Sequence, residues 1–165
     1  MPCLSVRAAL LLAAIAAGAA LAVAFAAEWW GGLVPCALCL VERWPYRVAI
    51  GLAVIGLALP RPAARLVLVL LLLVGLAEAG LAGLHAGVEF GWWPSPLPEC
   101  AAPKLGSGSI AERLRNMPAR PSKSCEDGVF PLSGVPLSFA DLNLLYALVF
   151  ASGLAISINA TRRRP

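Results

Sequence analysis

The chain has 165 residues, of which 60% are hydrophobic and 13% are charged, and its formal net charge is +4. Soluble globular domains are usually about 45–50% apolar and about 25% charged, so this composition excludes a disordered chain and argues against an ordinary soluble enzyme. The length allows one domain, and we predict that residues 1–165 form a single membrane domain.

The apolar residues are clustered into four segments that are suited to crossing a lipid bilayer. The first carries no charge, and its 20 residues at about 1.5 Å each would cover a hydrocarbon core of roughly 30 Å. The second apolar run is short by itself, so its helix must begin earlier and carry Arg43 and Arg47 near its outer end. The third is interrupted only by Glu78. We therefore predict an all-α integral membrane four-helix bundle with spans at about residues 8–27, 41–59, 65–85 and 140–159.

The short basic segments predict the orientation of this bundle. Four spans place both termini on one side of the membrane, and the short segments on that side hold six arginines and no acidic residue: Arg7, Arg61, Arg65, Arg162, Arg163 and Arg164. Because short cationic segments are cytoplasmic in membrane proteins, we expect cytoplasmic termini. The loops at about 28–40 and 86–139 then face outward, with the long one between the third and fourth helices. The positive charge follows from this topology, and no nucleic-acid partner is expected.

The alternative for residues 1–27 is a cleaved signal peptide, because Ala24-Phe25-Ala26 fits the small-residue cleavage pattern. The apolar stretch is longer than the roughly 7–15 residues of a signal-peptide core, which favours a retained helix. Residue 28 emerges on the outer side in either case.

Two local patterns add detail to the bundle. The segment 109–112 has the form of a capping box that begins a short helix to about residue 116, lying either on the bilayer surface or in solvent. The third span carries small residues at every fourth position, which allow close helix packing. These residues are Gly75, Ala79, Gly83 and Gly87.

The five cysteines divide by the predicted topology. Cys3 lies alone on the cytoplasmic side, whereas Cys36, Cys39, Cys100 and Cys125 all face outward. An oxidising compartment favours disulfides at such positions. Four cysteines allow three pairings, of which the natural one joins Cys36 to Cys39 and Cys100 to Cys125.

The Cys36-Ala37-Leu38-Cys39 motif suits a bond that opens and closes better than a structural cross-link. A two-residue spacer closes so short a loop that little chain entropy is removed. Pro35 is suited to the first position of a helix, which would place both cysteines in the first turn. There the helix dipole favours a thiolate, and cysteine pKa values fall to about 3.5–7.5. Arg43 would share their helix face and add a permanent positive charge.

The third span carries two ionisable residues, Glu78 and His85, which lie two helical turns apart and so share a face. Ionisable residues in spans usually face the bundle interior and mark function, and this face would approach the level of Cys36 and Cys39. His85 is either a packed interfacial histidine or a donor in a ligand site. For Glu78 we favour a partner within the bundle.

Other roles for these residues stay open. A zinc site built from Cys36, Cys39, His85 and another thiol is disfavoured, because structural zinc prefers paired ligand clusters and the chain has one close cysteine pair. We therefore expect no metal. In an alternative interpretation, the Cys100–Cys125 bond is only a structural cross-link. In another, Arg43 and Arg47 are interfacial anchors that extend toward the lipid headgroups.

The segment Pro35-Cys36-Ala37-Leu38-Cys39-Leu40-Val41-Glu42-Arg43 resembles the PCxLCxxxR signature of the DsbB family of disulfide bond formation proteins. The four spans, the outward cysteine pairs and the loop pair before the last helix are similar as well. The resemblance covers essentially the whole chain, although Cys100 and Cys125 match only by order and placement.

The resemblance implies a thiol oxidase of the bacterial inner membrane whose outward loops are periplasmic. A reduced carrier of the DsbA type would attack the Cys100–Cys125 disulfide and form a mixed disulfide with Cys100. Cys125 would then attack Cys36, so that the electrons pass to the Cys36–Cys39 pair. Cys39 would be left as a thiolate that engages a quinone of the membrane pool.

The resemblance also implies a quinone site, for either ubiquinone or menaquinone. Arg43 would hold the quinone oxygen, and His85, the only histidine, would supply the histidine that the family has near the quinone. Two other functions remain as alternatives. One is a membrane thiol reductant, or an epoxide-reductase-like four-helix protein, that runs electrons the other way; the other is a scaffold whose cysteines only link loops.

Overall fold

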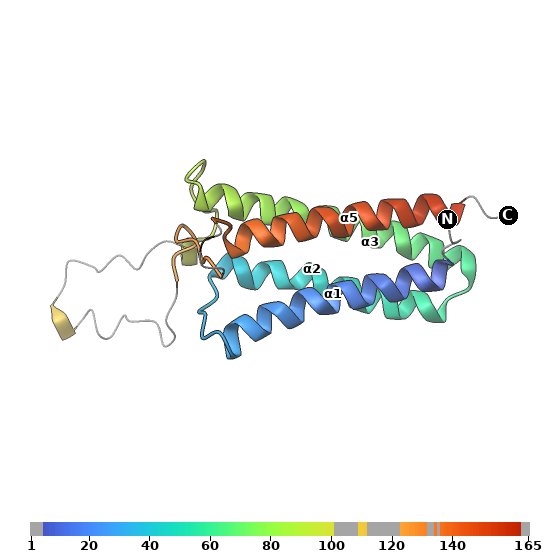
Figure 1. The fold of residues 1–165 in the computed structure, drawn as a ribbon, viewed down its shortest axis with the longest axis horizontal. Coiled ribbons are helices and arrows are strands. Elements are labelled where there is room, and N and C mark those ends of the chain that lie inside the picture. Colours follow the sequence, from blue (N-terminus) through green and yellow to red (C-terminus); the bar gives the residue numbers. More distant parts are fainter. Residues whose placement is uncertain (1–4, 101–108, 112–122, 132–133, 135, 163–165) are drawn as a thin grey trace.

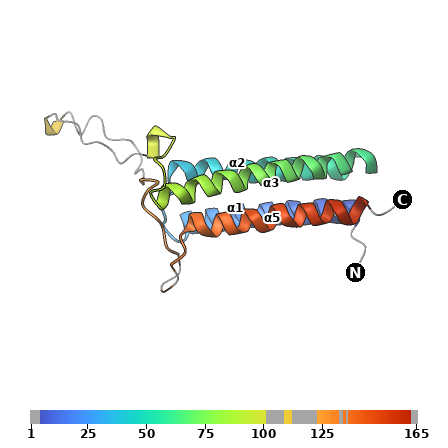
Figure 2. The same cartoon turned by 90° about the horizontal axis from the view of Figure 1, so that it is seen from above.

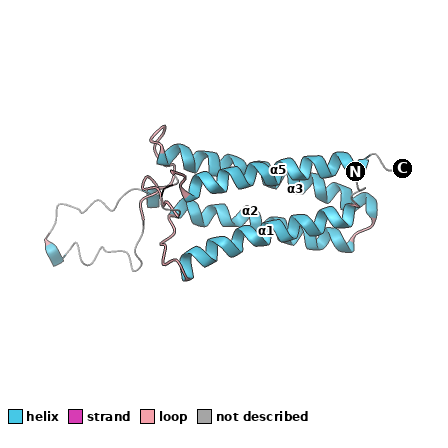
Figure 3. Ribbon diagram, in the orientation of Figure 1, coloured by secondary structure: helices cyan, strands magenta, loops and turns pink. Residues whose placement is uncertain are grey.

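The computed structural model describes residues 5–100, 109–111, 123–131, 134 and 136–162. Cys3 and most of the predicted 109–116 helix lie outside these residues; Ile110 and Ala111 are helical. Within them are four long α-helices, one short 3-10 helix and no strand, which confirms the all-α prediction (Figure 3). The elements are α1 (Val6–Trp29), α2 (Ala37–Ala58), α3 (Arg61–Glu89), η1 (Pro98–Cys100) and α5 (Phe139–Arg162).

The four helices run up and down along one axis (Figure 1). Viewed from above, α2 and α3 form one layer and α1 and α5 the other (Figure 2). Helix α1 packs mainly on α2, α5 packs mainly on α3, and α1 and α5 make few contacts with each other. We call the end where α2 and α5 begin the cysteine end, and the end where α1 begins and α5 finishes the terminal end.

Three of the helices are long and apolar enough to cross a membrane: α1, α3 and residues Phe139–Thr161 of α5. Helix α2 does not meet this criterion of length and composition, so a fourth span at about residues 41–59 stays a prediction. The reason is its charge, because Glu42, Arg43 and Arg47 all fall in its first half. Its place in the bundle covers Glu42 and Arg43, which are both buried.

Local hydrogen bonds fix where the helices begin. Ser5 Oγ accepts from Ala8 N at 3.1 Å at the start of α1. Before α5, Ser138 and Asp141 form a reciprocal capping box, with backbone-to-side-chain distances of 3.0 and 3.1 Å. Helix α2 starts at Ala37 with Cys36 as its N-cap. Pro35 therefore lies before the helix and is not its first residue, contrary to prediction.

The terminal end is packed with small and aliphatic side chains. Gly56 fits so closely that a Cβ atom there would lie 3.0 Å from Val67 and 3.1 Å from Leu10. On α3, Gly75 faces Phe150 of α5 in the same way, at 3.3 Å, which agrees with the predicted small-residue contact surface. The core of this end includes Ala9, Leu10, Ala13, Ala17, Ala49, Ala53, Leu68, Leu71, Leu154 and Ile158.

Candidate thiol redox site

The first cysteine pair lies at the start of α2. Cys36 Sγ accepts from Cys39 N at 3.2 Å, so the thiol replaces the usual oxygen of an N-cap. The two Sγ atoms are 2.8 Å apart, and both cysteines are free thiols. The two cysteines lie side by side as predicted, but the predicted Cys36–Cys39 disulfide is not formed. The hydrogen bond shared with Cys39 lowers the pKa of Cys36 below its usual range, although burial acts in the opposite direction.

The second pair, Cys100 and Cys125, forms a disulfide with an S–S distance of 2.08 Å, as predicted. It lies against the first pair: Cys36, Leu38, Cys100 and Cys125 belong to one buried cluster with Val88. An isolated parallel bridge joins the backbones of Cys36 and Lys123. Both cysteines of the disulfide are 1% exposed. Positions 36, 39, 100 and 125 therefore come together at one end of the bundle.

A chain of polar contacts runs from Cys36 into the bundle. His85 Nε2 lies 3.4 Å from Cys36 Sγ, and His85 Nδ1 lies 2.9 Å from Glu42 Oε1. Asn143 Nδ2 donates to Glu42 Oε2 at 3.0 Å and to Glu78 Oε1 at 2.9 Å. His85 is thus buried and faces a thiol, and its role as a donor in a ligand site stays a prediction. Glu78 has the bundle partner that the sequence favoured.

Arg43 lies one turn beyond Cys39 and is buried. Its Nη1 atom lies 2.9 Å from Glu28 Oε2, and its guanidinium carbon is 4.9 Å from the centre of the Phe25 ring. The Nε atom is buried and has no partner among the described residues. Arg47, by contrast, is exposed and lies over Trp44. The anchor interpretation therefore suits Arg47 and not Arg43.

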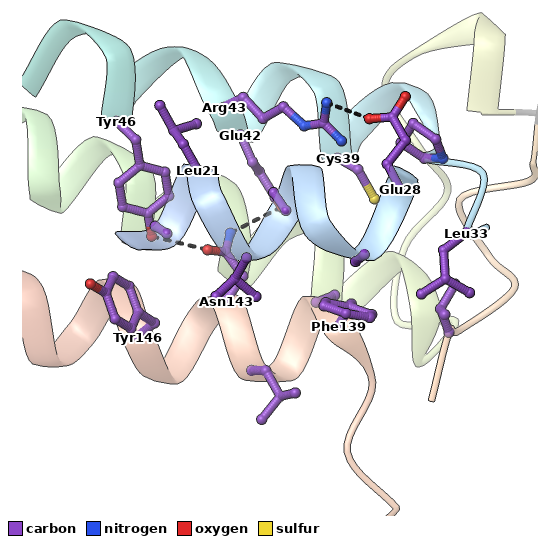
Figure 4. A pocket seen from close by; sticks show the side chains of 18 of the residues that line it. Leu21, Glu28, Leu33, Cys39, Glu42, Arg43, Tyr46, Phe139, Asn143 and Tyr146 are labelled. Atoms are coloured by element: carbon purple, nitrogen blue, oxygen red, sulfur yellow. Dashed lines mark hydrogen bonds and ion pairs between the residues drawn. The ribbon is translucent and has the colours of Figure 1, made fainter. Parts of the chain in front are cut away.

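An apolar cavity of about 380 Å³ lies beside the thiol pair, between α1, α2 and α5 (Figure 4). Its wall is mostly aliphatic and aromatic. The polar side chains that reach it include those of Cys39, Glu42, Arg43, His85 and Asn143. This volume is within the usual range of small-molecule sites, roughly 300–1,000 Å³. The cavity is suited to an apolar ligand with a polar group near Arg43.

The comparisons with known proteins agree with this arrangement. Residues 6–157 match the family described as "Disulfide bond formation protein DsbB". The chain belongs to the DsbB family. The family match implies a membrane-associated oxidoreductase of disulfide-bond formation. A relative, "Uncharacterized protein RP370" of Rickettsia prowazekii (strain Madrid E), is 27% identical over 139 residues, which cover 83% of this chain and 80% of the relative. No solved structure matches.

Three ligand atoms of the zinc alternative are also brought together. Those of Cys36, Cys39 and His85 lie within 4.8 Å of one another. The fourth thiol of that alternative is missing from the described residues, because Cys100 and Cys125 are bonded to each other. The absence of a metal in this DsbB-family chain stays a prediction.

Two residues of the site were missed by the sequence reasoning, Glu42 and Asn143. Glu42 lies one turn after Cys39 on α2, so its helix position gave a usable signal. Asn143 is a polar residue inside the predicted fourth span, and polar side chains at such positions often bond to neighbouring helices. Both residues line the cavity.

Proposed function

We propose that this DsbB-family protein is a thiol oxidase that takes electrons from a periplasmic dithiol carrier of the DsbA type and delivers them to a membrane quinone. One observation carries the proposal: the Cys100–Cys125 disulfide packs against Cys36, while Cys39 lines an apolar cavity. A route from a loop disulfide to a lipid-soluble oxidant needs this adjacency.

The packing of the two cysteine pairs against each other supports the following order of thiol exchange. A carrier thiolate attacks Cys100 and releases Cys125; the second carrier thiol then releases the oxidised carrier. Cys125 attacks Cys36 of the oxidised inner pair, and completion of the exchange re-forms the Cys100–Cys125 disulfide. The inner pair then holds two electrons.

The residues around the cavity fit a quinone, which the DsbB family uses. The observation is the buried Arg43 Nε, a hydrogen-bond donor without a partner among the described residues, in the wall of an apolar cavity. A quinone oxygen that accepts from Arg43 would satisfy this donor, and the apolar lining would cover the ring. A bound quinone supplies the two-electron oxidation of the inner thiols.

His85 and Glu42 would take up the proton that Cys36 loses when the inner thiols are oxidised. Cys36 Sγ faces His85 Nε2 at 3.4 Å, while His85 Nδ1 faces Glu42 Oε1 at 2.9 Å. With its Nδ1–H directed at the Glu42 carboxylate, the imidazole keeps the Nε2 lone pair toward the thiol. His85 therefore acts as the base, and Glu42 stabilises the imidazolium that forms.

The proposal is tested by mixing the purified protein with a reduced DsbA-type carrier and either ubiquinone or menaquinone, and following the quinone absorbance. We expect loss of absorbance that depends on Cys36, Cys39, Cys100 and Cys125. Absorbance that stays constant with both quinones, while the carrier remains reduced, would refute the oxidase.

A membrane thiol reductant is the second candidate, because Cys36 and Cys39 are free thiols in the structure. A reductant would use the same pairs to move electrons toward the carrier. Supplying a quinol and an oxidised carrier separates the two directions: net appearance of carrier thiols supports the reductant, and their absence supports the oxidase. Alkylation of the membrane-bound protein before purification measures the resting redox state of each cysteine pair.

A further inference from the structure

Glu78 is a buried acid for which the thiol relay gives no role. It is 1% exposed and lies two turns before His85 on α3. Its Oε1 atom accepts from Asn143, whereas its Oε2 atom is buried without a partner among the described residues. The described lining of the cavity does not include it. A carboxyl group inside an apolar helix is costly and usually has a function.

Asn143 links Glu78 to the base. Its Nδ2 atom donates to Glu42 and to Glu78, and its Oδ1 atom accepts from the Tyr46 hydroxyl at 3.0 Å. The opposite orientation of the amide would set its oxygen against two carboxyl groups and its nitrogen against the hydroxyl that now donates to it. Glu78 therefore helps to hold Asn143 in the orientation that donates to Glu42.

The two carboxyl groups are too close to be ionised together at low cost. Both bond to one nitrogen atom in apolar surroundings, where like charges repel more strongly than in water. Glu42 has a second partner in His85, whereas Glu78 has an oxygen with no partner. This arrangement favours the negative charge on Glu42 and the proton on Glu78.

The other ionisable groups around the network do not change this assignment. No positively charged side chain is bonded to Glu78 among the described residues, and Arg43 is paired with Glu28. The groups that face the network are Glu42 and Tyr46 from α2, His85 and Glu89 from α3, Asn143 and Tyr146 from α5, and Glu28 from α1.

We propose that Glu78 is a positioning residue: as a neutral carboxylic acid it holds the Asn143 amide, which keeps Glu42 ionised opposite His85. The proposal deepens the oxidase function and rests on it for any effect on turnover. The protonation of Glu78 and its influence on the Cys36 thiol are properties of the chain alone, so they are measured without carrier or quinone.

The first experiment records the infrared carbonyl stretch of protonated carboxyl groups in the purified, reduced protein at neutral pH. We expect a band that is lost in Glu78→Gln and retained in Glu99→Gln, a control at an exposed carboxyl group. Identical spectra for the wild type and Glu78→Gln would show that Glu78 is ionised and would overturn the proposal.

The second experiment follows thiolate absorbance against pH in a chain whose other four cysteines are serine, so that only Cys36 reports. Glu78→Gln keeps a neutral hydrogen-bond acceptor and should titrate like the parent. Glu78→Leu frees Asn143 and weakens the Glu42–His85 pair, so the thiolate should form at higher pH, by about one unit. Leu76→Ala, at an exposed position of α3, is the control.

Two outcomes of the titration would overturn the proposal. An unchanged curve for Glu78→Leu would show that Glu78 does not act on the base, and an equal displacement for Glu78→Gln would show that its charge is needed. If the leucine variant does not fold, the infrared band and the glutamine titration still decide. Because neither readout needs a quinone, an inactive oxidase would leave the inference testable.

Discussion

The two ends of the bundle are built from the same four helices but differ in what they bury. The terminal end buries alanine, leucine and glycine, with Gly56 fitted between Leu10 and Val67. The cysteine end buries charged and polar side chains, among them Glu42, Arg43, Glu78 and His85, and contains the cavity. The bundle therefore places its close apolar packing at one end and its polar, cysteine-containing site at the other.

The two ends also differ in the free-energy cost of burying their side chains. Burying polar groups is costly unless they are hydrogen-bonded, and most of those at the cysteine end are bonded to one another. Two buried atoms, Arg43 Nε and Glu78 Oε2, lack a partner among the described residues. We therefore expect substitutions at the cysteine end to change activity more than stability, and substitutions at the terminal end to do the reverse.

The largest effect on activity is expected for Cys39→Ser. Without this thiol the inner pair cannot be oxidised, so quinone reduction should fall to background while thermal unfolding in detergent stays close to that of the wild type. Cys3→Ser is the matched control and should retain full activity. Residual quinone reduction in Cys39→Ser would remove the inner pair from the route.

His85→Ala is expected to be the next most damaging change. Removal of a positioned base typically costs about 10²–10⁴-fold in rate, so oxidation of the inner thiols by the quinone should slow by that range. Rapid-quench alkylation of each pair measures this step directly. A rate within twofold of the wild type would show that Cys36 loses its proton without His85.

Arg43→Ala should have a smaller effect that is specific to the quinone. Loss of a hydrogen bond from a charged group costs about 1.5–3 kcal/mol, which predicts a quinone KM about 10–100-fold higher and unchanged exchange between the carrier and Cys100. Arg47→Ala, at an exposed position, is the control. An unchanged quinone KM would place the quinone away from Arg43.

Leu68→Ala is expected to have the smallest effect on activity, because Leu68 is fully buried at the terminal end. Creating a cavity there should lower the free energy of unfolding by about 2–5 kcal/mol, seen as a lower denaturation midpoint, with kcat unchanged below it. A loss of kcat without a loss of stability would contradict this expected difference between the two ends.

Much of the fold could be predicted because its signals are local. Long apolar runs mark α1, α3 and α5, and the order of the cysteines marks the Cys100–Cys125 pair. The first residue of α2 is harder to predict, because the thiol of Cys36, which caps this helix, is not among the usual capping side chains. The redox state of Cys36 and Cys39 depends on the surrounding potential as well as on the sequence.

The polar network could not be assembled from local patterns. Glu42 is 43 residues from His85 and 101 residues from Asn143 along the chain. Helical periodicity predicts which residues share a face of one helix, but it does not predict which residues of different helices contact each other. The shared face of Glu78 and His85 was predicted, whereas the amide that joins Glu78 to Glu42 comes from another helix.

The almost complete burial of the Cys100–Cys125 disulfide has a consequence for selectivity. A small thiol in solution has no surface with which to displace the side chains that cover this bond, whereas a folded carrier can exchange its own contacts for them. The side chains that cover the disulfide therefore restrict which thiols can reach it. For the proposed oxidase, this cover would limit access to the Cys100–Cys125 disulfide to a carrier protein whose surface can displace the covering side chains.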